Sequence, residues 1–293
     1  MLILICDAFD AGLAAKLARF GEVTDDMGRL GEADVALIRS KTKATAEWQK
    51  GAPKLKLIIR GGVGTDNIDK VAAKENGIQV NNTPKASGIA VAELAFAMMI
   101  AVPNHIVKAH NTMAEGEWAK KQLKRTELNG KKLGTVGIGN IAQELAKRGQ
   151  AFGMDVSFYD PYVDACGDFT KVADLGKLFA ECDYVSMHLP KTPETVNIVG
   201  KEILDGAKDG IVVVNSGRGA TVDADAMVAA LESGKVSCYA TDVWPSDPPA
   251  EDYPILKAPN VLMAPHLGAS TKENLLRIGE EVEAIIDAFV KEA

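Results

Sequence analysis

The sequence predicts an α/β protein with two doubly wound parallel sheets, each in a domain of its own. Over residues 2–80, short apolar segments of strand length alternate with segments of helical spacing, which is the pattern of βαβ units. A second series of buried strands begins at Leu133, and its first turn is rich in glycine. At 293 residues, the chain is long enough for each domain to bury a core.

The first series of elements fills residues 2–80. Its strands are recognised as short apolar runs, and Gly21 and Gly77 end its two helices. We expect strands at Leu2–Cys6, Asp34–Arg39, Leu55–Arg60 and Ile78–Val80, and helices at Ala11–Phe20 and Ile68–Asn76.

Two longer helices are expected outside this series. One begins near Val91 and contains Pro103, where we expect a break or kink. Its first half is apolar around most of its circumference, so it should be buried on several sides. The other, Lys272–Val290, follows a capping box in which Glu273 comes three residues after Ser270. We expect this last helix to fold back onto the first domain.

The second series opens with a strand, a glycine turn, a helix and another strand. Gly137 permits the tight turn, Gly139 lets a pyrophosphate approach the backbone, and Ala142 allows helix and strand to pack closely. The N-terminus of the helix offers free N–H groups and the positive end of a dipole to that pyrophosphate. An ordinary βαβ unit with glycines in its turn is the alternative. The complete G-x-G-x-x-A motif is Gly137-Ile-Gly139-Asn140-Ile141-Ala142.

An acidic residue decides between these readings. Asp160 ends the second strand, 21 residues beyond Gly139. There a carboxylate accepts hydrogen bonds from the hydroxyls of an adenosine ribose and repels a 2′-phosphate. The pattern therefore favours dinucleotide binding in a Rossmann domain, with NAD preferred over NADP. We expect residues 99–266 to form this NAD-binding domain, inserted in a flavodoxin-like substrate domain made of residues 1–98 and 267–293.

Polar side chains follow the later strands of the second domain, where ligands bind in doubly wound sheets. Arg218 lies in a glycine-flanked turn, Asp242 and Asp247 lie around a proline-rich turn, and His266 directly follows a strand. The strands are expected at Tyr184–His188, Ile211–Asn215, Cys238–Val243 and Val261–Ala264.

Arginine, carboxylate and histidine together suit the oxidation of a 2-hydroxy acid. Histidine takes the hydroxyl proton near neutral pH, and a carboxylate orients its ring and stabilises the imidazolium. Arginine binds the substrate carboxylate and polarises the new carbonyl. Individually, Arg218 could be a surface charge, Asp247 a turn-former and His266 a structural histidine. Their shared position at strand ends of one sheet favours catalysis.

The first domain contains a candidate anion site. The turn Gly61-Gly-Val63-Gly64 follows a strand, and its backbone N–H groups can form a nest for a carboxylate. Arg39 and Arg60 end buried strands, so a substrate role is expected for both. Lys41 and Lys43 are better explained as part of a solvated basic loop.

Composition excludes several classes of protein. The formal net charge of −7 argues against a general nucleic-acid binder. The four cysteines have no metal-ligand spacing, so we expect reduced thiols and no metal. The N-terminus does not resemble a signal peptide, and the longest uncharged apolar run, Leu94–Val102, is too short to span a bilayer. A cytoplasmic protein without membrane contact is expected.

The chain resembles the D-2-hydroxyacid dehydrogenase family, and within it the D-3-phosphoglycerate dehydrogenase branch. The resemblance runs in order along nearly the whole chain. It is carried by LIRSKTKATAE, IIRGGVGTDNID, NNTPKASGIAVAEL, GKKLGTVGIGNIA, YDPY, DYVSMHLPKTPET, VVNSGRGATVD, ATDVWPSDPP and APHLGAST.

The resemblance implies roles for individual residues. Arg218 and His266 take the catalytic positions of the family, and Asp247 takes that of its catalytic glutamate. Asp242 matches the aspartate at the nicotinamide carboxamide. The remaining cofactor positions are Gly137, Gly139, Asn140, Ile141, Asp160, His188, Pro190, Thr195, Ser216 and Gly217, of which His188, Pro190 and Thr195 match the loop beside the adenine. The substrate positions are Arg39 and Arg60 near a phosphate, Val63 and Gly64 at the carboxylate, and Ser87.

Three departures from the family pattern stand out. Asp247 is one methylene shorter than glutamate, which removes about 1.5 Å of reach in a network sensitive to misplacement. Either the turn moves closer, a water bridges to His266, or the imidazolium is less stabilised. Ser87 stands where many relatives have asparagine. The chain also ends after its last helix, so no serine feedback through a C-terminal regulatory domain is expected.

The resemblance implies an NAD-dependent oxidation of 3-phospho-D-glycerate to 3-phosphohydroxypyruvate, the entry to serine synthesis. Reduction of glyoxylate, hydroxypyruvate or another 2-keto acid is the alternative enzymatic reading. An NAD-sensing co-repressor of the same fold ranks below both, because nothing here resembles a partner-binding tail. The family also implies a homodimer, which would suit the long apolar helix after Val91. Lys120 and Lys121 either reach a neighbouring subunit or form a solvated basic stretch.

Overall fold

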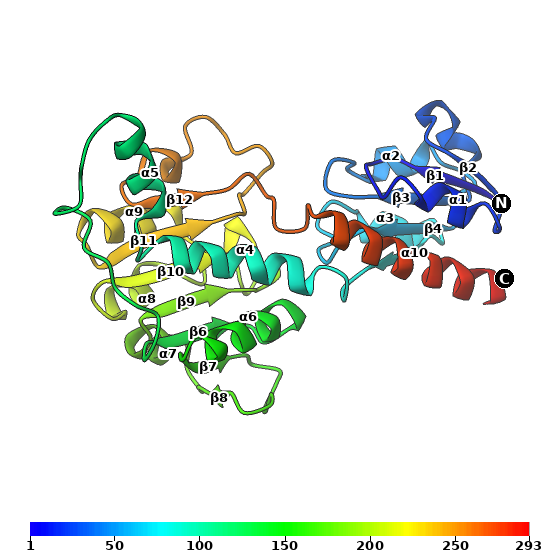
Figure 1. The fold of residues 1–293 in the computed structure, drawn as a ribbon. Helices are drawn as coiled ribbons and strands as arrows, with labels where there is room; N and C mark the ends of the chain where they lie inside the picture. Colours follow the sequence, from blue (N-terminus) through cyan, green and yellow to red (C-terminus); the bar gives the residue numbers. More distant parts are fainter. Residues whose placement is uncertain (293) are drawn as a thin grey trace. The chain divides into compact units, whose positions relative to one another are not determined.

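The computed structural model describes residues 1–292, which form two compact α/β units. One unit comprises Met1–Ser87 and the C-terminal segment that begins at Ala269, and the other is Gly88–Gly268 (Figure 1). Each unit is built on one parallel sheet, so the predicted fold class is confirmed. The sequence-based boundary between residues 98 and 99 falls inside helix α4 (Gly88–Ala101), which lies wholly in the second unit.

The sheet of the first unit has five parallel strands in the order β2-β1-β3-β4-β5. The sequence did not reveal β2, which is short and only partly buried. The strands are β1 (Leu2–Ile5), β2 (Glu22–Thr24), β3 (Val35–Ile38), β4 (Leu57–Arg60) and β5 (Gln79–Asn82). The helices are α1 (Leu13–Leu17), α2 (Ala46–Lys50), α3 (Lys70–Glu75) and α10 (Lys272–Glu292), with a 3₁₀ helix η1 (Met27–Glu32).

Both faces of this sheet are covered, as its apolar strands require. Leu37 and Ile59 pack with Ile278 of α10, so the last helix does belong to the first unit, as expected. Ile38 and Ile58 pack in a second cluster with residues next to α2 and α3. Successive side chains of a strand point to opposite faces of the sheet. Leu37 and Ile59 therefore face one layer of helices, and Ile38 and Ile58 face the other.

The sheet of the second unit has seven parallel strands in the order β12-β11-β10-β9-β6-β7-β8. They are β6 (Lys132–Val136), β7 (Asp155–Tyr159), β8 (Thr170–Lys171), β9 (Tyr184–Met187), β10 (Ile211–Asn215), β11 (Val236–Thr241) and β12 (Val261–Met263). The helices are α4, α5 (Ile106–Ala114), α6 (Asn140–Ala151), α7 (Leu175–Glu181), α8 (Lys201–Gly206) and α9 (Ala224–Glu232), with 3₁₀ helices η2 (Gly219–Thr221) and η3 (Pro254–Lys257).

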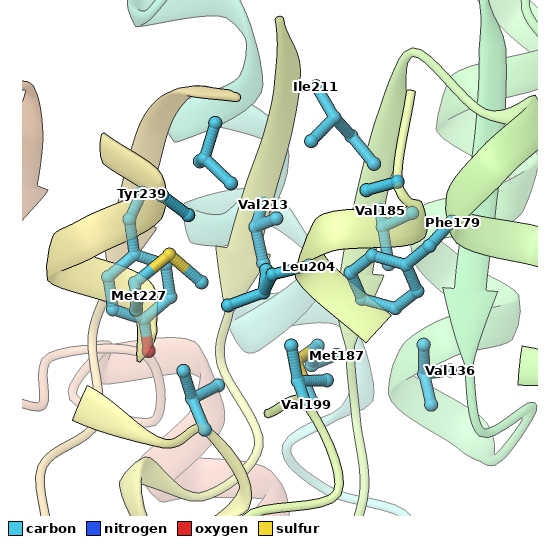
Figure 2. Close-up of a cluster of buried hydrophobic side chains, with 14 of the residues drawn as sticks. Val136, Phe179, Val185, Met187, Val199, Leu204, Ile211, Val213, Met227 and Tyr239 are labelled. Carbon is cyan, nitrogen blue, oxygen red and sulfur yellow. The ribbon is translucent and has the colours of Figure 1, made fainter. Parts of the chain in front are cut away.

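Helices cover both faces of this sheet as well. Figure 2 shows one face, where Val185 and Val213 of the sheet pack with Phe179 of α7, Leu204 of α8 and Met227 of α9. The opposite face packs against α4 and α6. The strands are therefore buried on both sides, and their carboxyl ends remain as the place for polar residues.

The apolar helix predicted from Val91 is broken near Pro103, as expected. α4 and α5 meet at a bend of 63°, and His105 between them has a left-handed φ of 51°. No single helix within residues 1–292 is long and apolar enough to cross a membrane. The bent pair of α4 and α5 reaches the necessary length and apolar composition only when the two helices are taken together.

The start of α10 differs from the predicted capping box. Thr271, not Ser270, accepts the hydrogen bond at the helix start, from the Asn274 amide at 3.1 Å. Asn274 is buried, and its side chain donates to the Ala269 carbonyl at 2.7 Å. The correction follows from the first helical residue being Lys272, which makes Thr271 the capping position.

Candidate active site

The three predicted catalytic residues follow adjacent strands. Arg218, Asp247 and His266 lie after β10, β11 and β12, which are neighbours in the sheet. Because parallel strands end at the same edge, the turns that carry these residues lie together. This is the edge where the sequence placed them.

His266 and Asp247 form a direct hydrogen bond. The Nδ1 atom of His266 lies 2.5 Å from Oδ2 of Asp247, and both side chains are about one third exposed. A carboxylate only accepts, so Nδ1 carries a proton, and in the neutral ring Nε2 then has the free lone pair. Of the three consequences weighed for the shorter acid, the structure therefore shows the first, in which the turn brings Asp247 within direct contact.

Asp242 fixes the backbone that follows His266. Its two carboxylate oxygens accept hydrogen bonds from the amides of Leu267 at 2.7 Å and Gly268 at 2.8 Å. These bonds hold the chain beyond His266, whose own φ of 57° is left-handed. Burial raises the pKa of Asp242, and the two amide hydrogen bonds oppose that shift.

The turn that carries Arg218 is stabilised by its own polar groups. Asn215 accepts from the Gly217 amide at 3.0 Å and donates to the Arg218 carbonyl at 3.0 Å. Thr221 donates to the same carbonyl at 2.7 Å. The Arg218 guanidinium donates to the Gly217 carbonyl at 2.7 Å, so its side chain is directed by a short local contact.

Trp244 connects the turns that carry the candidate catalytic residues and was not identified from the sequence. Its indole N–H donates to the Ala264 carbonyl at 3.0 Å, which links the turn after β11 to the segment before His266. At Gly219, a Cβ atom would fall 2.4 Å from the Trp244 carbonyl carbon, so the Arg218 turn also contacts this tryptophan. The only sequence signal was its place in the proline-rich turn.

The glycine turn has the conformation expected for a pyrophosphate site. Gly137 has a φ of 85°, which favours glycine, and Gly139 precedes α6 with no atom within 4 Å of where its Cβ would lie. Asn140 opens α6 and is exposed, and Ile141 follows it. The open backbone at a helix N-terminus fits a bound dinucleotide phosphate.

Asp160 lies beside this turn at the end of β7. One of its oxygens accepts from the Ile138 amide at 3.1 Å and the other from the Tyr162 amide at 2.9 Å. Each oxygen keeps a second lone pair, so the fixed carboxylate can still accept ribose hydroxyls. The glycine turn and Asp160 therefore offer the phosphate and ribose contacts that NAD requires.

The loop after β9 carries the other predicted cofactor residues. Thr195 donates to the Pro190 carbonyl at 2.7 Å, which closes the loop on itself. The His188 ring lies between Ser186 Oγ, 2.9 Å from Nε2, and Ser216 Oγ, 3.3 Å from Nδ1. The side chain of His188 is therefore directed at neighbouring strand ends, although the resemblance placed it in the adenine loop.

In the first unit, Arg39 and Arg60 lie at the carboxyl end of the sheet. Ile38 of β3 pairs with Arg60 of β4, and Arg39 comes directly after Ile38. Arg39 makes long contacts of 3.4 Å to the carbonyls of Ala8 and Ala269. Its buried Nε has no hydrogen-bond partner among residues 1–292. Burial lowers the pKa of Arg39, and the Asp7 carboxylate opposes this.

Asp7 organises the loop around Arg39 and was missed by the sequence analysis. Its carboxylate accepts from the Arg39 amide at 2.5 Å and from the hydroxyl of Thr42 at 2.8 Å. Asn67 adds bonds to the carbonyls of both residues. The available signal was an acid two residues after β1, at the same carboxyl end of the sheet as Arg39.

Only part of the glycine turn in the first unit can act as a nest. The Gly61 amide donates to Ile38 and the Gly62 amide to Thr83. Val63 and Gly64, in contrast, have no acceptor for their amides within the described residues. Gly62 has a φ of 141°, and its missing Cβ leaves room for the Arg60 guanidinium.

Ser87 is enclosed rather than open. It is only 1% exposed, and its hydroxyl accepts a long bond of 3.4 Å from Asn274. Sequence alone could not show this burial, because the partner lies 187 residues away. Among residues 1–292, no cluster of three or more His, Cys, Asp or Glu side chains could hold a metal ion.

Comparison with known proteins gives the same family repeatedly. The family model described as "D-isomer specific 2-hydroxyacid dehydrogenase, NAD binding domain" matches residues 96–268. Hydroxypyruvate reductase of Thermotoga maritima is 45% identical over 253 residues, covering 86% of this chain and 83% of that protein. D-3-phosphoglycerate dehydrogenase of Methanocaldococcus jannaschii is 40% identical over 284 residues, covering 92% of this chain but 54% of that protein. The chain thus spans about half the length of the latter.

Solved structures of NAD-dependent dehydrogenases have the same fold as this chain. D-lactate dehydrogenase of Aquifex aeolicus, complexed with NAD and lactic acid, superposes with a TM-score of 0.87 at 28% identity, covering 100% of this chain and 96% of that one. NAD-dependent formate dehydrogenase of Staphylococcus aureus, in complex with NAD, gives a TM-score of 0.86 at 29% identity, with coverages of 99% and 96%.

Proposed function

This chain belongs to the D-isomer specific 2-hydroxyacid dehydrogenase family and carries its NAD-binding domain, and on this premise we propose that it oxidises 3-phospho-D-glycerate to 3-phosphohydroxypyruvate. The direct hydrogen bond between His266 and Asp247 carries the proposed chemistry. Arg39 and Arg60 of the first unit are the residues on which the proposed phosphate specificity depends. In a cell this reaction would be cytoplasmic and would supply serine synthesis.

The proposed mechanism assigns one task to each side chain. Nε2 of His266 accepts the proton of the substrate hydroxyl, while its Nδ1–H stays bonded to Asp247 and stabilises the resulting imidazolium. Arg218 binds the substrate carboxylate and stabilises negative charge on the developing carbonyl oxygen. Bound NAD supplies the hydride acceptor.

Arg39 and Arg60 are the basis for a phosphorylated substrate. Arg39 follows β3 and Arg60 is the last residue of β4, and the buried Nε of Arg39 lacks an acceptor among residues 1–292. A phosphate would give this guanidinium a charge-assisted partner. The Val63 and Gly64 amides would bind the carboxylate through the same edge of the sheet.

A substrate panel tests this proposal. We expect kcat/KM with NADH to be higher for phosphohydroxypyruvate than for hydroxypyruvate or glyoxylate. Arg60→Ala should lower the value for the phosphorylated substrate about 10- to 100-fold, since a hydrogen bond to a charged group contributes about 1.5–3 kcal/mol. The other two substrates should change little. Lys43→Ala, in the exposed loop, is the control. Equal values for all three substrates would refute phosphate specificity.

Reduction of hydroxypyruvate or glyoxylate is the second candidate. The Thermotoga relative, of which this chain covers 83%, is named hydroxypyruvate reductase, and its name supports this alternative. In that case, phosphorylation of the substrate would give no advantage, and Arg60→Ala would affect all substrates alike. A co-repressor-like role ranks third, and it would be favoured by tight NADH binding without turnover of any 2-hydroxy or 2-keto acid.

We also propose a homodimer formed through α5 and the segment after it. Ile106, Val107 and Met113 of α5 are each more than half exposed, and Trp118 is 73% exposed. Ile106 and Val107 line a cavity of about 650 Å³ at the amino ends of β9, β10 and β11. A second copy would bury this apolar surface, which is unusual for a monomer.

Light scattering after size exclusion tests the dimer. Val107→Glu together with Trp118→Ala should shift the protein to the monomer mass. Val71→Glu changes another exposed apolar residue, on α3, and should leave the mass unchanged. A wild-type monomer at micromolar concentration would contradict the proposal.

A further inference from the structure

The His188 side chain has no part in the proposed chemistry, yet it lies at the centre of the strand ends that support it. β9, which precedes it, lies between β6 and β10 in the sheet. β6 leads to the glycine turn at Gly137, and β10 leads to the turn of Arg218. The end of β9 is therefore placed between the expected phosphate site and the catalytic arginine.

Backbone packing shows that these turns touch. A Cβ at Gly217 would lie 3.0 Å from both the amide nitrogen and the carbonyl oxygen of Leu189. A Cβ at Gly137 would lie 3.4 Å from the His188 carbonyl oxygen. The backbone of His188 and Leu189 thus lies beside both glycine turns, too close to Gly217 to admit a Cβ atom and at ordinary contact distance from Gly137.

The imidazole adds a polar connection. Ser186 Oγ lies 2.9 Å from Nε2, and Ser216 Oγ lies 3.3 Å from Nδ1, so both ring nitrogens are engaged. Ser186 belongs to β9 and is fully buried, which gives the ring a fixed base. Ser216 lies two residues before Arg218. Burial lowers the pKa of His188 to about 3, so the ring is neutral at physiological pH and serves as a polar connector without charge.

We propose that His188 is a positioning residue that holds the Ser216–Arg218 turn through its Nδ1 contact with Ser216, and so sets the Arg218 guanidinium for binding the substrate carboxylate. The inference rests on the proposed carboxylate-binding role of Arg218. The ring itself touches no substrate. Its effect on catalysis passes through the turn.

Two substitutions of His188 separate this role from a general structural one. In His188→Asn, the side-chain amide occupies roughly the place of Nδ1 and keeps the bond to Ser216. In His188→Gln, the longer amide occupies roughly the place of Nε2, keeping Ser186 and losing Ser216. We expect the KM for hydroxypyruvate to rise at least tenfold in His188→Gln and less than threefold in His188→Asn. The Kd for NADH should differ less than threefold between the two variants, because both alter the same residue of the cofactor loop.

Several outcomes would overturn the inference. Equal KM changes in the two variants would do so, as would a loss of NADH affinity that parallels the KM. If neither variant folds, Ser216→Ala removes the same hydrogen bond. An unchanged KM for hydroxypyruvate in that variant would then reject the inference.

Crystal structures of the variants give a reading that does not depend on activity. We expect a displaced Arg218 side chain in His188→Gln only, and an unmoved one in both would reject the inference. Absence of turnover in the wild-type enzyme would instead contradict the proposed function, and the structural comparison would still decide the position of Arg218.

Discussion

Asp247 contacts the His266 ring directly, with a side chain one methylene shorter than glutamate. The contact is possible because the turn after β11 is held close to the segment before His266 by the Trp244 indole. The sequence allowed three outcomes for this pair, because side-chain reach depends on where a turn places its Cα atom. The types of the candidate catalytic residues were readable from the sequence, and the distance between their side chains was not.

Replacement of this acid should impair catalysis strongly. Asp247→Asn presents no carboxylate to the His266 Nδ1–H, so both ring orientation and imidazolium stabilisation suffer. We expect kcat/KM for hydroxypyruvate to fall about 100-fold or more, in the range usual for general acid–base catalysis. Steady-state kinetics with saturating NADH measures this. Asp252→Asn, at an exposed position of the same loop, should behave as wild type.

The glutamate of the family should not improve this enzyme. Because Asp247 already lies at hydrogen-bond distance, one more methylene would have to push the turn or the ring away. Asp247→Glu should therefore lower kcat/KM by about 10-fold, because small misplacements in such networks are costly. A gain in activity would show that the short acid limits the wild-type reaction.

Burial of His188 should make the protein less stable to unfolding as the pH falls below neutral. Its folded pKa of about 3 lies below the ordinary value of 6.5, so the unfolded chain binds more protons between these values. The stabilisation is complete above pH 6.5 and is lost as the pH falls towards 3. His188→Asn should consequently show a smaller drop in Tm between pH 7 and pH 5 than wild type. The exposed His110→Asn serves as control, and parallel curves for all three proteins would contradict the expectation.

Helix α6 packs on β6 so closely that glycine is favoured over alanine at one position inside it. A Cβ at Gly149 would lie 2.7 Å from Cδ2 of Leu133, which is fully buried. Overpacking costs about 1–3 kcal/mol, whereas alanine gains about 1 kcal/mol in helix propensity. Gly149→Ala should thus destabilise the protein by about 1 kcal/mol in a denaturant titration.

A second glycine provides the matched control. Gly206 at the end of α8 has no atom within 4 Å of where its Cβ would lie. Gly206→Ala should be neutral or stabilise by up to about 1 kcal/mol, because only the propensity remains. Destabilisation of the same size in both variants would argue against the packing explanation for α6.

Most elements were predictable because their apolar residues are periodic. β10 runs from Ile211 to Asn215 as expected, and Pro103 breaks the apolar helix. β2 escaped notice because it has three residues and no buried run. The cap of α10 was misplaced by one residue, since Ser270 and Thr271 are chemically equivalent caps and only the backbone selects between them.

At the scale of the whole molecule, the candidate residues fall into two groups on two units. Arg218, Asp247 and His266 belong to Gly88–Gly268, whereas Arg39 and Arg60 belong to the other unit. Sequence order indicated this division, because the dinucleotide motif follows a complete α/β series. Burial of Ser87 by Asn274 was not predictable, since it arises from the return of the last helix.

The second unit should fold alone. Its buried clusters contain only its own residues, and the sheet is covered on both faces without any element of the first unit. We expect a fragment of residues 88–268 to unfold cooperatively on heating and to bind NADH, because Gly137, Gly139 and Asp160 are all present. It should not reduce hydroxypyruvate or phosphohydroxypyruvate, since it lacks the Val63 and Gly64 amides as well as both arginines. Calorimetry and NADH fluorescence titration measure the first two properties. A fragment with substantial turnover would show that the first unit is dispensable for substrate binding. A fragment that unfolds cooperatively but binds no NADH would place essential cofactor contacts in the first unit.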